Sequence, residues 1–170
     1  ELYSSLLEAF GPEKIENNPA AVDFCIRELP RFLDRYLLAK EMMKVTQDFV
    51  IFGNNWEFYG LFESLTNGPI SLDDCPALFS NSKLTLQNNN HGIGVHSRTL
   101  SAMASGGFVF THRSPRDELP GGINTLFEPK VHYGSFDRES IFEEAHRWLS
   151  FDNERDIIAE RARKLVLTEM

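Results

Sequence analysis

One polar, glycine-containing stretch holds the residues best able to bind a charged ligand. It covers residues 88–107 and reads NNNHGIGVHSRTLSAMASGG. Glycines allow an anion to approach the backbone closely, and the guanidinium of Arg98 can donate two parallel hydrogen bonds to phosphate oxygens. Histidine side chains exchange protons near neutral pH, so His91, His96 and the later His112 can act as proton donors or phosphate contacts. The stretch therefore predicts an anion-binding site.

Two strands and a short helix are expected to position this site. Residues 83–87 alternate polar and apolar side chains, and residues 108–110 form an apolar, β-prone run. Between them, Ser97 is the expected N-cap of a helix over residues 98–104, and the glycine pair at 106–107 is a typical helix stop. Because the loop ends at a helix N-terminus, unpaired N–H groups and the positive end of the helix dipole would face a ligand.

The rest of the chain alternates between helical and extended patterns. Ser135 or Asp137 is the expected cap of the first helix after the last strand, and Asp152 the expected start of the final helix. The expected helices cover residues 2–10, 19–45 with an interruption at Pro30, 72–79, 138–149 and 154–169, and the further strands cover residues 48–53, 68–71 and 127–133.

This order of elements predicts an α/β fold with an open, parallel, doubly wound sheet of the Rossmann type. Right-handed crossovers would place the loops after Phe52, Gln87 and Phe110 on one rim of that sheet. The first part of the chain is helical throughout. We therefore expect a helical arm or interdomain helices over residues 1–45 and a Rossmann-like domain over residues 46–170.

Composition excludes several classes of protein. The chain has 170 residues, a formal net charge of -8 and 42% hydrophobic residues, which suits one globular domain with an appendage and disfavours nucleic-acid binding. No apolar run approaches the roughly 18 residues that a transmembrane helix needs. Cys25 and Cys75 lack the spacing of a zinc or redox motif, so we expect reduced thiols and a cytoplasmic location. The chain opens with Glu1 and no leader, and we expect it to be a fragment of a longer protein.

Several motifs together resemble the C-terminal half of group 1 glycosyltransferases. They are SKLTLQNNN, Arg98, SAMASGGFVFT, ELPGGINTLFEP, VHYGS and NERDIIAERARKLVL. The closest similarity is to the spore-maturation-type branch, whose pattern is an Arg, then Glu-Ala-x-Ala-x-Gly-Gly, then a buried strand. The resemblance covers roughly residues 48–170. It implies the donor-binding domain of a two-domain GT-B fold, which transfers a sugar from a nucleotide-diphosphate donor. We therefore expect the N-terminal acceptor domain to be missing from this chain.

The resemblance also implies which residues bind the donor. The loop over residues 88–96 and the helix after it would hold the diphosphate, with no metal ion and no other cofactor. Catalytic residues are not identified. The implied substrate-binding residues are Asn88, His91, Gly92, Gly94, Ser97, Arg98 and Ser101.

The sequence departs from the family pattern at two positions. Many group 1 enzymes carry two acidic residues eight positions apart, one near the transferred sugar and one near the ribose, and these align with Ile93 and Ser101. Isoleucine accepts no hydrogen bond, and serine offers one short hydroxyl in place of a carboxylate. The spore-maturation branch commonly lacks the first acid. Loss of the second indicates weaker ribose binding, a different nucleotide, or a site that binds without catalysis.

Each candidate residue also has a structural interpretation. Arg98 could form a surface salt bridge, and each histidine could be a hydrogen-bonded loop residue. Ser97, Ser101 and Ser105 share one helical face, which suits either a ligand or close packing on a sheet. Trp56 could stack on a base or sugar, or fill the core.

An alternative function belongs to a different class. A non-catalytic ligand-binding or interaction module could retain this fold without the acidic ribose contact, because fold does not determine function.

Overall fold

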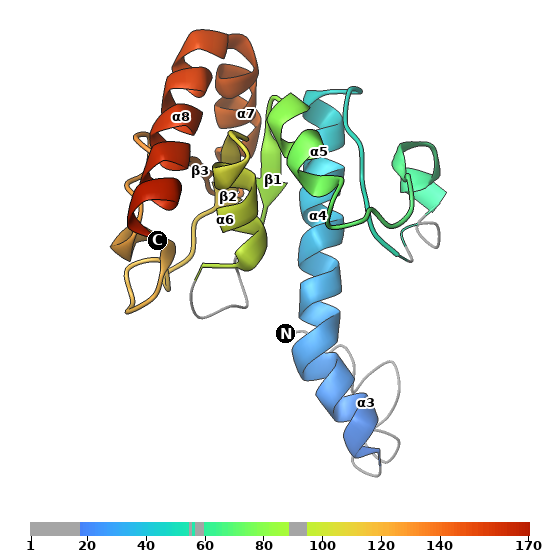
Figure 1. Ribbon diagram of the computed structural model, residues 1–170. Helices are drawn as coiled ribbons and strands as arrows, with labels where there is room; N and C mark the ends of the chain where they lie inside the picture. Colours follow the sequence, from blue (N-terminus) through green and yellow to red (C-terminus); the bar gives the residue numbers. More distant parts are fainter. Residues whose placement is uncertain (1–17, 55, 57–59, 89–94) are drawn as a thin grey trace. The chain divides into compact units, whose positions relative to one another are not determined.

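The computed structural model describes residues 18–54, 56, 60–88 and 95–170 (Figure 1). Internal contacts divide the chain into two units, Glu1–Lys40 and Glu41–Met170. The helix expected over residues 2–10 lies outside the described residues. This division says nothing about what each part binds, so the functional division into residues 1–45 and 46–170 stays a prediction.

The first unit contains a helix that passes through Pro30. It consists of α3 (Pro19–Asp23), a π-helical turn η1 (Phe24–Glu28) and α4 (Leu29–Val45), which leads into the second unit. At the end of the π turn, the backbone N–H of Leu29 donates to the carbonyl oxygen of Phe24, five residues earlier. Proline has no N–H and crowds the carbonyl four residues before it, so a wider turn accommodates it. The interruption expected at Pro30 therefore takes the form of a π turn just before it.

The second unit is built on a three-stranded parallel sheet (Figure 1). Its strands are β1 (Thr85–Gln87), β2 (Val109–His112) and β3 (Gly134–Phe136), in the spatial order β1-β2-β3. The main helices around them are α5 (Cys75–Asn81), α6 (Ser97–Ala104), α7 (Ile141–Ser150) and α8 (Asp152–Glu169), with short 3-10 helices η3 (Gly60–Leu65) and η4 (Ile123–Thr125). This confirms the predicted α/β fold with an open parallel sheet.

Alternating side chains along β2 show that helices cover both faces of the sheet. Val109 packs with Ala102 and Met103 of α6 and Ala162 of α8 in one buried cluster. The preceding residue, Phe108, points to the opposite face, where its ring lies 5.0 Å from that of Trp148 in α7. Successive side chains of a strand point to opposite faces, so α6 and α8 cover one face and α7 covers the other.

Helix α6 ends in the glycine motif that the sequence predicts. Gly106 has φ +80°, its N–H donates to the carbonyl of Met103, and the N–H of Gly107 donates to that of Ala102. These two bonds define a Schellman motif, which satisfies carbonyls that the helix leaves unpaired. A Cβ at Gly107 would lie 2.8 Å from the backbone oxygen of Phe79, so this position also needs glycine for close packing against α5.

Two predicted strands do not form. Residues 48–53 make one isolated bridge, Ile51 to Thr66, supported by a 2.8 Å bond from the N–H of Ile51 to the carbonyl of Leu65. Residues 68–71 form no strand, although the carbonyl of Gly68 accepts from the N–H of Gly53. The backbone N–H and C=O groups of an apolar extended run can pair with any nearby segment. Here they pair with residues 65–68, which follow the run closely in the chain. The loop after Phe52 therefore does not follow a strand of this sheet.

The last strand begins later than predicted. Residues 127–133 are a turn region closed by a bond from the N–H of Lys130 to the carbonyl of Tyr133, and Lys130 has a positive φ of 64°. Pro129 cannot donate to a strand ladder. The strand is instead β3, and Ser140, rather than Ser135 or Asp137, occupies the N-cap position of α7. The start of α8 at Asp152 agrees with the prediction.

Candidate functional site

The carboxyl ends of the three parallel strands meet at one edge of the sheet. Gln87 at the end of β1 pairs with Thr111, and His112 at the end of β2 pairs with Phe136 at the end of β3. The residues that follow these strands therefore share that edge, which we call the carboxyl edge: Asn88, Arg113 and Asp137. In open parallel sheets, ligands bind outside this edge.

A partly buried hydrogen bond connects the carboxyl edge to the start of α6. The hydroxyl of Thr99, in the first turn of α6, donates to the side-chain oxygen of Gln87 at 2.5 Å. Thr99 is 5% exposed, so water does not replace this bond easily. Gln87 and Thr99 lie on either side of the loop over residues 88–96, and their bond fixes the α6 N-terminus beside the end of β1.

His96, and not Ser97, is the N-cap of α6. Its backbone is extended, with φ -68° and ψ 141°, and its Nδ1 atom accepts a 3.1 Å hydrogen bond from the backbone N–H of Arg98. The carbonyl of His96 accepts from the N–H of Thr99 at 2.8 Å. The backbone N–H groups of Arg98 and Thr99, which the sequence predicts to be unpaired, therefore both donate hydrogen bonds to His96. An anion binding to the N–H of Arg98 must displace the imidazole.

The predicted α6 ligands lie on the outer side of this helix. Ser97, Arg98 and Ser101 are exposed, while α6 buries Thr99, Ala102 and Met103. The guanidinium of Arg98 makes no ion pair with an acidic side chain in the described part of the chain. The exposure of the two serines shows that they do not serve close helix-to-sheet packing.

The remaining candidates lie in or beside the loop after β1. Asn88 is partly buried at the carboxyl edge and makes further contacts. His91, Gly92 and Gly94 lie outside the described residues, as does Ile93, so their part in the site stays a prediction.

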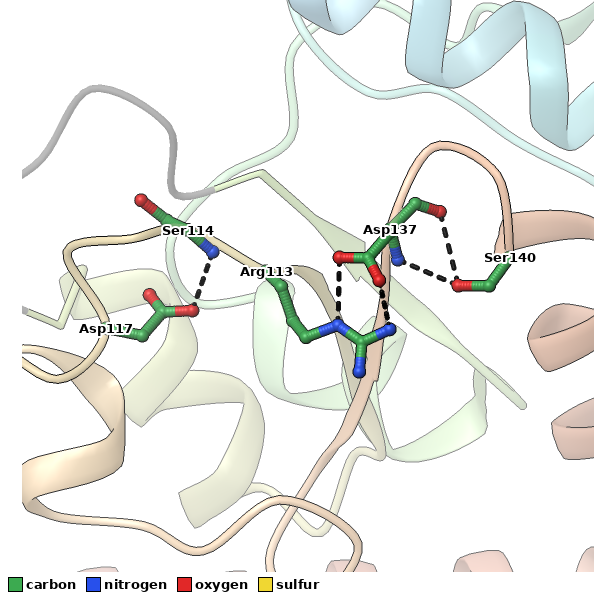
Figure 2. Close-up of polar contacts among 5 residues, drawn as sticks. All are labelled: Arg113, Ser114, Asp117, Asp137 and Ser140. Carbon is green, nitrogen blue, oxygen red and sulfur yellow. Dashed lines mark hydrogen bonds and ion pairs between the residues drawn. The ribbon is translucent and has the colours of Figure 1, made fainter.

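Arg113 and Asp137 form an ion pair across the carboxyl edge (Figure 2). Nε of Arg113 donates to Oδ1 of Asp137 at 2.9 Å, and Nη2 donates to Oδ2. The pair is bidentate, the geometry in which an arginine fork and a carboxylate interact most specifically. It joins the end of β2 to the end of β3.

The segment after Arg113 is held by a second polar network. Oδ2 of Asp117 accepts a 2.8 Å bond from the N–H of Ser114 (Figure 2), and the carbonyl of Asp117 accepts from the N–H of Asn124. The side-chain oxygen of Asn124 in turn accepts from the hydroxyl of Tyr133. Burial, followed by the negative charges of Asp117 and Glu118, raises the pKa of Tyr133 above its ordinary value. Tyr133 therefore stays a neutral hydrogen-bond donor.

Trp56 and His112, for which the sequence allows more than one interpretation, both make contacts with aromatic rings. Trp56 lies edge-on against the fully buried Phe62, with 5.5 Å between ring centroids. His112 lies 5.6 Å from the ring of Phe136, also edge-on. The contact of Trp56 fits its interpretation as a core residue. His112 is the last residue of β2 rather than a loop residue, and its ring packs against Phe136.

Within the described ranges, no three His, Cys, Asp or Glu side chains gather in a way that could hold a metal ion. Nor does any helix there have the length and apolar character to cross a membrane.

A comparison with protein families shows which family this chain belongs to. A family described as glycosyl transferase-like matches residues 27–170, most of the chain. The chain belongs to this glycosyl transferase-like family. A search of curated proteins finds no match. The family confirms the resemblance to glycosyltransferases, and glycosyl transfer is the general chemistry associated with it. The parallel sheet with helices on both faces fits a glycosyltransferase domain of the Rossmann type.

Several residues at or beside the carboxyl edge do not stand out in the sequence. Thr99, Arg113 and Asp137 belong to none of the quoted motifs, and Gln87 lies within SKLTLQNNN without any sign of its bond to Thr99. One available signal is position: Arg113 and Asp137 are charged and each directly follows a strand, where parallel topology brings side chains together. That signal depends on correct strand ends, and the end of β3 is predicted three residues too early.

Proposed function

We propose that this glycosyl transferase-like chain carries the donor-binding domain of a GT-B glycosyltransferase. It would correspond to the C-terminal half, in the spore-maturation-type branch, and its donor would be a nucleotide-diphosphate sugar. The observation that supports this most directly is the fixed position of the α6 N-terminus at the carboxyl edge, where the Thr99–Gln87 bond holds it. A helix N-terminus favours anions, and a diphosphate is the anionic part of such a donor.

The proposed chemistry is displacement at the anomeric carbon of the sugar. An acceptor hydroxyl forms a new C–O bond there, the bond to the diphosphate oxygen breaks, and its electron pair leaves with the diphosphate. The hydroxyl proton passes to a base that would come from the acceptor side of the complete enzyme. In this scheme Arg98 and the α6 dipole stabilise the negative charge that develops on the leaving group. The scheme requires no metal ion.

In this proposal, the serine at position 101 limits the hydrogen bonds that the site can make to the ribose of the nucleotide. Ser101 is exposed on α6, and its hydroxyl can make one hydrogen bond to a ribose where a carboxylate would accept two. We therefore expect the diphosphate contacts to contribute a larger share of donor affinity than they do in relatives with an acidic residue at that position.

Calorimetry with uridine-, guanosine- and adenosine-diphosphate sugars tests the proposal. The protein should bind at least one of them, and Arg98→Ala should weaken that binding about tenfold or more, because hydrogen bonds between charged groups contribute roughly 1.5–3 kcal/mol. The matched control is Arg161→Ala, which removes an exposed arginine from α8 and should leave affinity unchanged.

Absence of binding by the full-length protein, with Arg98→Ala indistinguishable from the parent, would exclude the proposed function. Binding without sugar transfer to any acceptor, or to water, would instead favour the non-catalytic module.

A further inference from the structure

We propose that Arg113 is a second ligand of the donor diphosphate, and that Asp137 orients its guanidinium for this role. This inference rests on the proposed function, because it names a further contact for the same donor. It assigns roles to two residues that no motif in the sequence identifies.

The position of Arg113 is the first argument. It directly follows β2, the central strand, and its backbone N–H donates to the carbonyl of Phe136 in β3 at 2.8 Å. On one side lies the end of β1, which leads into the loop before α6, and on the other side lies Asp137. The base of the Arg113 side chain is therefore fixed in the middle of the carboxyl edge, where ligands of open parallel sheets bind.

The unused donors of the guanidinium are the second argument. An arginine side chain has five N–H donors. Asp137 takes one from Nε and one from Nη2, along one edge of the fork. Nη1 and the other N–H of Nη2 make no hydrogen bond or ion pair with any residue in the described ranges. They form a second bidentate edge, and the side chain is 48% exposed, so a phosphate can reach it.

The rigid hold on Asp137 is the third argument (Figure 2). Its backbone N–H donates to the hydroxyl of Ser140 at 2.9 Å, and its carbonyl accepts from the N–H of Ser140 at 3.1 Å. This turn fixes the backbone of Asp137 relative to β3, so its carboxylate starts from a defined position beside Arg113. A half-exposed ion pair contributes only about 0–1 kcal/mol to stability. Its bidentate geometry is better explained by orienting the guanidinium than by stabilising the fold.

The net charge of the chain favours local cationic contacts of this kind. A net charge of -8 repels an anionic donor at long range. Binding then depends on cations placed locally at the carboxyl edge, and Arg113 is held there by backbone and side-chain contacts together.

Calorimetry on the parent and three variants tests this inference. The probes are uridine, guanosine and adenosine diphosphates and the three nucleosides without phosphate. Arg113→Met should weaken diphosphate binding about 10- to 100-fold and leave nucleoside binding unchanged, because only the phosphate contact is lost. Asp137→Asn should weaken diphosphate binding about 3- to 10-fold, since the guanidinium remains but is less well oriented.

The matched control is Arg116→Met. Arg116 is an exposed arginine three residues away whose guanidinium has no described hydrogen bond or ion pair, and its loss changes the net charge equally. It should leave affinity within about twofold of the parent, because exposed charges act weakly at a distance in salt. If Arg113→Met does not fold, Arg113→Lys keeps the charge without the fork and should lose about 3- to 10-fold.

The possible failures are distinguishable. If the parent binds a nucleoside diphosphate and Arg113→Met binds it equally well, the inference is wrong and the proposed function stands. Equal losses of nucleoside and diphosphate binding, or tighter diphosphate binding by Asp137→Asn, would also overturn the inference. If the parent binds none of the diphosphates, both proposals are wrong.

Discussion

Thr99 shows how one buried hydroxyl positions the candidate site. Thr99→Val keeps the shape of the side chain but leaves the amide oxygen of Gln87 without its donor. We expect the free energy of unfolding to fall by about 0.5–1.5 kcal/mol, the usual net contribution of an intramolecular hydrogen bond. Urea denaturation of the two proteins measures this difference.

A threonine outside the site provides the control for this experiment. Thr168 is exposed on α8 and bonds only to the carbonyl of Lys164 in its own helix. Thr168→Val should change stability by less than about 0.5 kcal/mol. Equal stabilities for Thr99→Val and the parent would show that the bond to Gln87 does not hold α6 in place.

At the residue scale, the sequence identifies candidate ligands on α6 but not the hydrogen bonds that hold the start of this helix. The exposure of Arg98 and Ser101 agrees with a role in ligand binding. The N-cap is wrong by one position, because serine is the better intrinsic cap but His96 has the extended backbone that a cap requires. The bond between Thr99 and Gln87 joins two elements and has no local sequence signal.

At the scale of single elements, the C-terminus of α6 depends on a glycine for steric reasons. In Gly107→Ala, the new Cβ would lie 2.8 Å from the carbonyl oxygen of Phe79 and 3.2 Å from that of Ala102. Backbone atoms cannot move away as a flexible side chain can, so we expect a loss of about 1–3 kcal/mol in unfolding free energy. Thermal or urea unfolding measures it.

Gly60 is the matched control, because no described atom lies within 4 Å of a Cβ built there. Gly60→Ala should stay within about 0.5 kcal/mol of the parent. Similar effects of the two substitutions would contradict the steric explanation.

The start of α8 predicts a dependence of stability on pH. Hydrogen bonds from Arg155 and then from Lys83, together with their positive charges, hold the pKa of the Asp152 carboxyl below its usual value. The folded pKa is therefore lower than the unfolded one. The contribution of Asp152 is fully present above the unfolded pKa and is lost as the pH falls through the folded pKa.

Asp152→Asn should accordingly reduce the loss of stability between about pH 5 and pH 2. Urea denaturation midpoints across this range measure the effect. Asp156→Asn, which removes an exposed carboxylate from the same helix with no described ion pair, is the control. If both variants follow the parent curve, the interactions of Asp152 do not contribute to acid sensitivity.

At the scale of the whole molecule, the sequence predicts the class of fold and misses part of its topology. The parallel sheet, α6 with its glycine stop, and the late helices α7 and α8 follow from periodicity and punctuation. The apolar run at residues 48–53 has the composition of a buried strand but bonds to residues that follow it in the chain, and composition does not specify a partner. The ion pair between Arg113 and Asp137 depends on the register of three strands, which local patterns do not determine.

A crystal structure of the full-length protein with a bound nucleotide-diphosphate sugar tests the central claim most directly. We predict that the diphosphate lies at the carboxyl edge, with its oxygens about 3 Å from the guanidinium nitrogens of Arg98 and Arg113. The pair between Arg113 and Asp137 should be retained, because the phosphate uses the other edge of the fork. A donor bound away from the carboxyl edge, with Arg98 and Arg113 making no contact to it, would contradict the account.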